Sequence, residues 1–279
     1  MKSKSNITEP FLIRVFLIVI AIGFIGVFVA LPVAVIFIEA LAKGIGAYFN
    51  ELNNDNAKAA IKLTVLVAAI SVPCNMVFGL AASWAITKFE FFGKRLLITL
   101  IDLPFSVSPV IAGLIYVLLL GANSVMGKWL DAHNMQVIFA VPGLVIATIF
   151  VTFPFVAREL IPLMEEQGTE EEEAAIMLGA NGWQTFWNVT LPNIKWGLFY
   201  GVLLSNARAM GEFGAVSVIS GHIEGVTNTL PLHVESLYNG YNFVGAFAVA
   251  SLLTVLAVFT LILKMIIEYY YPHEIKAAR

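Results

Sequence analysis

The sequence has 279 residues, of which 59% are hydrophobic and only 13% are charged, and its mean hydropathy is +0.86. Soluble domains are about half apolar and about a quarter charged, so this composition excludes a water-soluble enzyme. A net charge of -3 gives no basic surface for nucleic acid, and the single cysteine, Cys74, excludes an intrachain disulfide.

The apolar residues form long runs. Four runs carry no charged residue, and two more contain only isolated charges at Asp102, Arg208 and Glu212. Each run exceeds the roughly 20 residues that cross a bilayer core as a helix. We therefore predict an all-α integral membrane protein with six transmembrane helices, at residues 15–38, 63–87, 96–121, 135–157, 196–220 and 238–263.

Lysine and arginine are unevenly divided between the segments that connect these runs. Cytoplasmic segments of membrane proteins carry the excess of positive charge. The pattern therefore predicts a cytoplasmic N-terminal segment at residues 1–13, a six-helix domain at 14–272 and a cytoplasmic tail at 273–279. With both ends inside, the inner segments hold Lys2, Lys4, Arg14, Lys88, Lys94, Arg95, Arg158, Lys195, Lys264, Lys276 and Arg279, against Lys43, Lys58, Lys62 and Lys128 outside.

The inner segment at residues 158–195 is much longer than the other inner connections. Its residues 170–173 are all glutamate and precede strong helix formers. We expect Thr169 to cap a helix here in a capping box with Glu172, with the acidic first turn facing the positive helix end. A second amphipathic stretch at 183–189 follows, and we expect Leu191-Pro192 to end it.

A charge run of this kind is often a solvated connector. Apolar and aromatic residues beside the acidic run, including Met177, Leu178, Trp183 and Trp187, favour a docking surface instead.

The spacing within this loop resembles the EAA motif of ABC-importer permeases, which reads Glu-Ala-Ala, three residues, Gly, nine residues, Ile, one residue, Leu-Pro. The only departure is Val189 in place of isoleucine. The resemblance implies a type I permease fold whose coupling helix docks in a groove of a cytosolic ATPase subunit, of which the importer contains two copies. The matching positions are Glu173, Ala174, Ala175, Gly179, Leu191 and Pro192.

The chain itself has no Gly-x-x-x-x-Gly-Lys-Ser/Thr phosphate loop. No catalytic residues or cofactor are therefore expected here, and the resemblance implies that ATP and Mg are bound by the partner ATPase.

Four further segments resemble the sulfate, thiosulfate and molybdate permease group, and the last two most resemble the W-type subunit of sulfate/thiosulfate importers. They lie at residues 102–113, 206–216, 220–235 and 241–251. The resemblance implies a bacterial inner-membrane location, alternating access, a T-type permease partner and an extracytoplasmic sulfate-binding protein.

Two alternatives remain open. One is a molybdate or tungstate permease. The other is an anion transporter driven by an ion gradient, with Asp102, Arg208 and Glu212 as relay charges.

Two groups of polar residues are candidates for the anion path. Arg208 and Glu212 stand four residues apart, so they either pair to lock the helix or line the pore. Ser108-Pro109 has the pattern of a helix start inside the third run, where free amides and the hydroxyls of Ser106 and Ser108 would face a passing oxyanion. A kink that serves only helix packing is the alternative.

The histidines indicate no metal site, because their spacing matches no standard zinc pattern. His222, Glu224 and His233 lie in the last outer segment, and we predict that they contact the extracytoplasmic binding protein.

Overall fold

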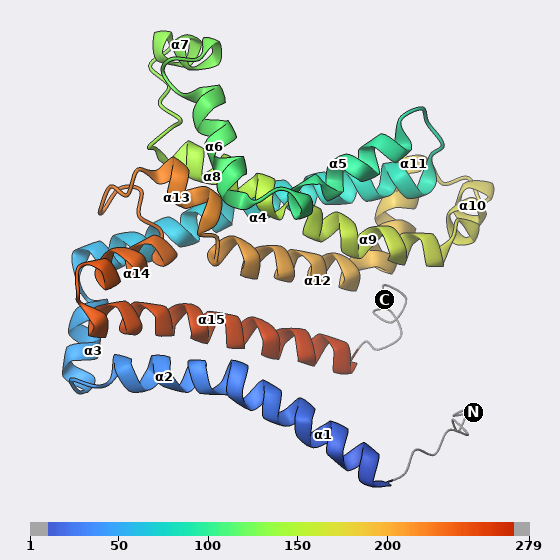
Figure 1. Cartoon of the computed structure of the whole chain (residues 1–279). Coiled ribbons are helices and arrows are strands. Elements are labelled where there is room, and N and C mark those ends of the chain that lie inside the picture. The colour runs from blue at the N-terminus through green and yellow to red at the C-terminus, as the bar shows by residue number, and fades with distance from the viewer. Residues whose placement is uncertain (1–10, 271–279) are drawn as a thin grey trace.

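The computed structural model describes residues 11–270, with side chains described as far as Ile266. The predicted tail at 273–279 and the first ten residues of the predicted N-terminal segment lie outside the described residues. Within them, every regular element is a helix (Figure 1). The elements are α1 Phe11–Ile25, the π-helical segment η1 Gly26–Ala30, α2 Leu31–Ala40, α3 Ile45–Leu52, α4 Asp55–Lys88, α5 Lys94–Ser106, α6 Pro109–Leu120, α7 Val125–Ala132, α8 Val141–Thr152, α9 Pro154–Gln167, α10 Glu170–Met177, α11 Gly182–Thr185, the π-helical segment η2 Phe186–Thr190, α12 Leu191–Met210, α13 Gly214–Ser220, α14 Leu230–Asn239 and α15 Phe243–Tyr270.

Four of the described helical segments are long and apolar enough to cross a membrane, and α5 with α6 makes a fifth if the bent pair is one span. The predicted count of six is therefore not reproduced by length and hydropathy. The difference lies in the predicted span at 196–220, because the helix breaks between Met210 and Gly214 into α12 and the short α13. The four unbroken segments are Phe11–Ala40, Asp55–Lys88, Val141–Gln167 and Phe243–Ile266.

The helix does not end at Leu191-Pro192, so that prediction was wrong. The Leu191 amide donates to the Phe186 carbonyl five residues earlier, and η2 continues directly into α12. This wider turn accommodates Pro192, which has no N–H and would clash with a carbonyl in a straight α-helix. The same arrangement precedes Pro32, where the Leu31 amide donates to the Gly26 carbonyl.

The core of the bundle is built around α9, which packs between α4 and α12. One buried polar contact joins α4 to α8, where the Asn75 side-chain amide donates to the Thr152 hydroxyl at 2.7 Å. Such bonds between helices replace the hydration that lipid does not supply. The buried residues of the core cluster around α9 are Val156, Leu160, Leu163 and Met164 on α9 and Ile194 on α12.

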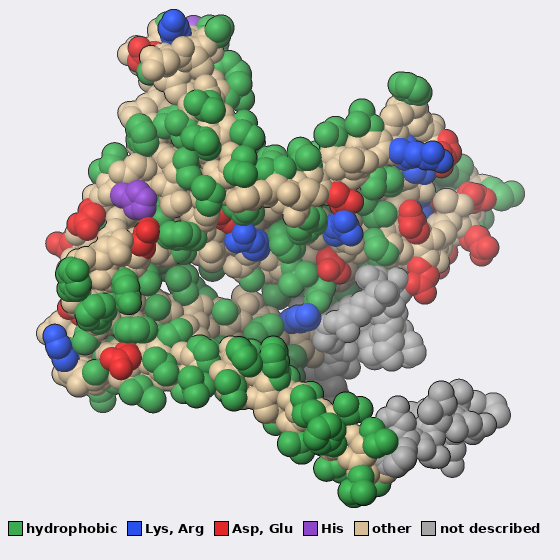
Figure 2. All heavy atoms as spheres, viewed as in Figure 1, with side chains coloured by type: hydrophobic (Ala, Val, Ile, Leu, Met, Phe, Trp, Pro, Cys, Tyr) green, Lys and Arg blue, Asp and Glu red, His purple; other side chains and the backbone are tan. Residues whose placement is uncertain are grey.

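The two ends of the bundle carry different elements. The Phe11 end of α1 and the C-terminal end of α15 lie at the same end as α10 and α11, and α3 and α14 lie at the opposite end (Figure 1). Figure 2 shows acidic side chains gathered over the α10 end. Within the described residues, the beginning of α1 and the end of α15 thus lie on the same side of the bundle as the acidic loop.

Candidate functional site

The acidic loop folds into a short, strongly exposed helix, α10. The side chains at its end are apolar and face outward: Met177 and Leu178 are 88% and 89% exposed, and Trp183 at the start of α11 is 72% exposed. Large apolar side chains exposed this far, at the water-facing end of a membrane protein, indicate a surface that a protein partner covers.

The glycine of the motif has a defined structural task. The Gly179 amide donates to Ile176 and the Ala180 amide to Ala175, which is a Schellman ending of α10. This ending needs a left-handed residue, and Gly179 has φ +92°. A Cβ there would meet nothing, so the constraint lies in the backbone alone. The fixed distance from Ala175 to Gly179 in the motif follows from this hydrogen-bond geometry.

The predicted capping box at the start of α10 is wrong. Thr169 precedes the helix as expected, but its hydroxyl donates to the Glu173 carboxylate at 2.7 Å and makes no backbone cap. Glu172 is occupied elsewhere, by partners from α4 and η2. The capping box of this loop starts α11 instead, with Asn181 and Gln184 bonded reciprocally at 2.9 Å. The Asn-x-x-Gln pattern was the sequence signal for it.

The other motif residues lie either on the exposed helix α10 or where the loop enters the bundle. Glu173 and Ala174 are exposed on α10, and Ala175 is half-buried. Leu191, at the start of α12, packs against the core cluster around α9. The motif therefore joins an exposed helix to the bundle interior.

The third predicted span is interrupted as expected. The axis turns by 107° between α5 and α6, and α6 begins with Ser108 as N-cap and Pro109 in its first turn. Ser106 and Ser108 are both exposed, and within the described chain neither hydroxyl has a side-chain partner. The first half of α6 packs closely against α13. The absence of a side chain at Gly113 permits this approach, since a Cβ there would lie 2.7 Å from the Ala215 carbonyl oxygen.

Arg208 and Glu212 form an ion pair, with Nη1 and Oε2 2.7 Å apart. The prediction that both residues lie in one helix was wrong, because Glu212 lies in the break between α12 and α13. Its other oxygen accepts the Ala215 amide at the start of α13, at 2.9 Å. The Glu212 side chain is 1% exposed and the Arg208 side chain 35%. The carboxylate thus ties the end of α12 to the beginning of α13.

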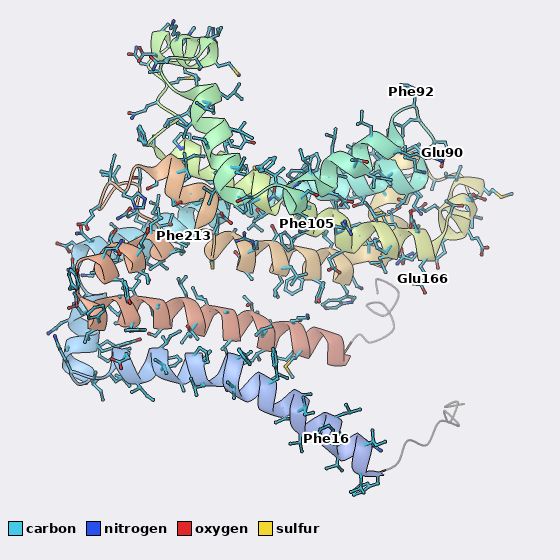
Figure 3. The ribbon with its side chains drawn as sticks, viewed as in Figure 1. Phe16, Glu90, Phe92, Phe105, Glu166 and Phe213 are labelled. Atoms are coloured by element: carbon cyan, nitrogen blue, oxygen red, sulfur yellow. The ribbon has the colours of Figure 1, made fainter. Side chains whose placement is uncertain are left out.

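A second ion pair escaped the sequence analysis. Arg158 Nε lies 2.7 Å from Asp102 Oδ1, and the guanidinium lies over the Phe105 ring at 5.5 Å. Figure 3 labels Phe105 beside the bend between α5 and α6. The partners lie 56 positions apart on α5 and α9, so no local pattern pairs them.

The three candidate docking residues of the outer segment differ in their surroundings. His222 Nδ1 lies 3.9 Å from Glu235 Oε2, and the Asn56 side-chain amide donates to the Glu224 carboxylate at 2.9 Å. His233 is 3% exposed, and its burial lowers the pKa of the imidazole, against the opposing effect of Glu224. A side chain this buried does not offer a docking contact, so the prediction for His233 needs correction. Across residues 11–266, no three potential metal-binding side chains gather.

Residues 75–273 match the protein family described as "Binding-protein-dependent transport system inner membrane component". The chain belongs to this family. The match begins in the second half of α4 and continues past Tyr270, so it includes the acidic loop and both helix breaks. The predicted resemblance to importer permeases is thereby confirmed.

Relatives within the family are close. The sulfate transport system permease protein CysW of Synechocystis sp. is 52% identical over 96% of this chain and 98% of its own length. CysW of Escherichia coli K12 is 53% identical over 89% and 85%. CysT of the same strain is 36% identical over 82% and 83%. The closer likeness to W-type permeases agrees with the sequence analysis.

The fold also occurs in solved importers. A bacterial alginate ABC transporter, crystallised with an alginate-bound periplasmic protein, contains a chain that superposes with a TM-score of 0.74. It covers 93% of both chains at 17% identity. The all-helical permease fold predicted from the sequence is thus supported by a superposable structure, which shows the fold alone.

Proposed function

We propose that this chain is the permease subunit of an ATP-driven importer for sulfate and thiosulfate. The observation that carries the cargo assignment is the 52% identity to a sulfate permease over nearly the full length of both chains. The partners are a T-type permease subunit, two copies of a cytosolic ATPase that binds ATP and Mg, and an extracytoplasmic sulfate-binding protein.

The coupling step uses the exposed loop. Met177, Leu178 and Trp183 present the apolar surface that a groove on the ATPase would cover, and Gly179 fixes its turn. ATP binding brings the two ATPase subunits together, and the loop transmits that motion to the helices, which alternate between inward-open and outward-open. Both chain termini lie on this cytoplasmic side. On the opposite side, His222 and Glu224 belong to the surface that meets the binding protein.

The complete importer, reconstituted in liposomes with its binding protein, tests this function. We expect radiolabelled sulfate uptake only when ATP is present with the ATPase, and an excess of molybdate should not compete. Uptake by this chain alone on a proton or sodium gradient would contradict the proposal. Competition by molybdate at low concentration would reassign the cargo.

The anion path passes the α5–α6 break in this proposal. Two exposed, unpartnered hydroxyls, Ser106 and Ser108, flank the bend, and the first turn of α6 has free amides. Hydroxyl and amide donors stabilise an oxyanion without a fixed charge that would hold it too tightly.

Replacing both Ser106 and Ser108 with alanine should lower sulfate uptake about 10- to 30-fold, because each neutral hydrogen bond contributes about 1 kcal/mol. Purified complex should stay at the wild-type amount. Thr99→Ala is the matched control, because this exposed α5 hydroxyl donates to the Arg95 carbonyl of its own helix. Equal uptake by the double variant and the control would show that these hydroxyls do not contact the anion.

A further inference from the structure

One ion pair joins the coupling helix to the membrane bundle. Lys88 is the last residue of α4, and Glu172 lies in the first turn of α10. Their Nζ and Oε2 atoms are 2.8 Å apart, and the two side chains are only 9% and 16% exposed. Exposed ion pairs contribute little, whereas a pair withdrawn from water is held in one geometry.

Each partner also has a second bond. Lys88 Nζ donates to the Gly168 carbonyl at 2.5 Å, and Gly168 is the residue that separates α9 from the α10 cap. The other Glu172 oxygen, Oε1, accepts the Thr190 hydroxyl at 2.6 Å. Thr190 is the last residue of η2, where the chain enters α12. This small group therefore ties α10 to α4, to the end of α9 and to the beginning of α12.

Neighbouring bonds strengthen the same contact. The Gln167 side-chain amide donates to the Asn193 carbonyl at 3.0 Å, and the Asn193 side chain donates to Glu171. By contrast, within residues 11–266 the Glu173 carboxylate of the motif bonds only to the Thr169 hydroxyl at the start of the same helix. The contact between α10 and the spans thus depends on residues outside the motif, with Lys88 and Glu172 as its buried, charged centre.

We propose that Lys88 and Glu172 are positioning residues, whose ion pair makes a displacement of α10 move α4 and α12 together. This inference rests on the proposed function and deepens it, because it names the contact through which motion of the ATPase reaches the membrane helices. Without the pair, α10 still carries its exposed apolar side chains and still docks, but it moves without pulling the spans.

The assembled importer carrying Lys88→Met or Glu172→Gln tests this role. We expect the ATPase to co-purify as in wild type and ATP hydrolysis to continue. Sulfate taken up per ATP hydrolysed should fall about tenfold, the size of a typical coupling between sites. Lys88→Arg should retain coupling. The double variant Lys88→Glu with Glu172→Lys restores an ion pair and should recover coupling. The recovery should be only partial, because the Gly168 carbonyl loses its donor.

The matched control is the pair Lys94 and Glu90, joined at 2.6 Å at the same end of the bundle but with Glu90 89% exposed. Lys94→Met and Glu90→Gln should change neither uptake nor coupling.

Amide hydrogen exchange of residues 170–190 in the same complexes measures how firmly α10 is held to the bundle, and it needs no sulfate. Exchange should rise in Lys88→Met and Glu172→Gln, and return toward wild type in Lys88→Arg. Unchanged exchange would overturn the proposal, and so would faster exchange with an unchanged ratio of sulfate to ATP. If the wild-type importer moved no sulfate, the proposed function would fail, while the exchange result would still decide whether the pair holds α10.

Discussion

Changing Met177 and Leu178 together to glutamate is expected to abolish docking of the ATPase and, with it, all ATP-driven uptake. These two side chains are 88% and 89% exposed in the isolated chain. Burying a large apolar side chain contributes about 1.5–3 kcal/mol, so losing both removes about 3–6 kcal/mol of binding free energy. Each 1.4 kcal/mol is about tenfold, which predicts an affinity at least about 100-fold lower. Introduced carboxylates raise the cost further, because they would be buried without a partner.

The measurement is the amount of ATPase that co-purifies with the permease in mild detergent. Phe92→Ser is the matched control, because this residue is fully exposed in the turn between α4 and α5 at the same end of the bundle (Figure 3). Its loss should leave the ATPase bound. Retention of the ATPase by the double variant would place docking outside α10.

The helix α10 was predictable because its sequence signals are local. Four consecutive glutamates followed by helix formers predict α10, and the Schellman bonds of Ala180 and Gly179 explain why the glycine stands where it does. The capping box with Glu172 was mispredicted for the opposite reason. The partners that occupy this carboxylate, Lys88 and Thr190, stand 84 and 18 positions away and belong to other helices.

The membrane spans show the same division between local and distant information. Length and hydropathy locate the first span best, at 15–38 against Phe11–Ala40, whereas the span predicted at 238–263 begins within α14, before α15 starts at Phe243. Ser108-Pro109 marks the bend of the third span. The break between α12 and α13 was missed, because the i,i+4 spacing of Arg208 and Glu212 is equally typical of a continuous helix. The carboxylate of Glu212 stabilises the break, because it accepts the Ala215 amide at the start of α13.

Replacing Arg208 alone is expected to destabilise the folded protein strongly. Replacing both members of the ion pair is not. Arg208→Gln leaves the 1% exposed Glu212 carboxylate without a cation. Breaking a buried pair from one side costs about 3–5 kcal/mol, a large share of the roughly 5–15 kcal/mol that stabilises a domain. We expect little assembled importer from this variant. Lys94→Gln, which breaks the exposed i,i+4 pair with Glu90, should assemble normally.

The double variant Arg208→Gln with Glu212→Gln separates the two roles of the pair. A glutamine oxygen at position 212 can still accept the Ala215 amide, and no uncompensated charge remains, so assembly should return to the wild-type amount. Sulfate uptake per assembled complex should stay within about threefold of wild type, a difference of under 1 kcal/mol, if the pair serves only the fold. A guanidinium held 2.7 Å from a carboxylate is already neutralised and gives little attraction to a dianion. Normal assembly with uptake reduced more than tenfold would instead show that Arg208 contacts the anion.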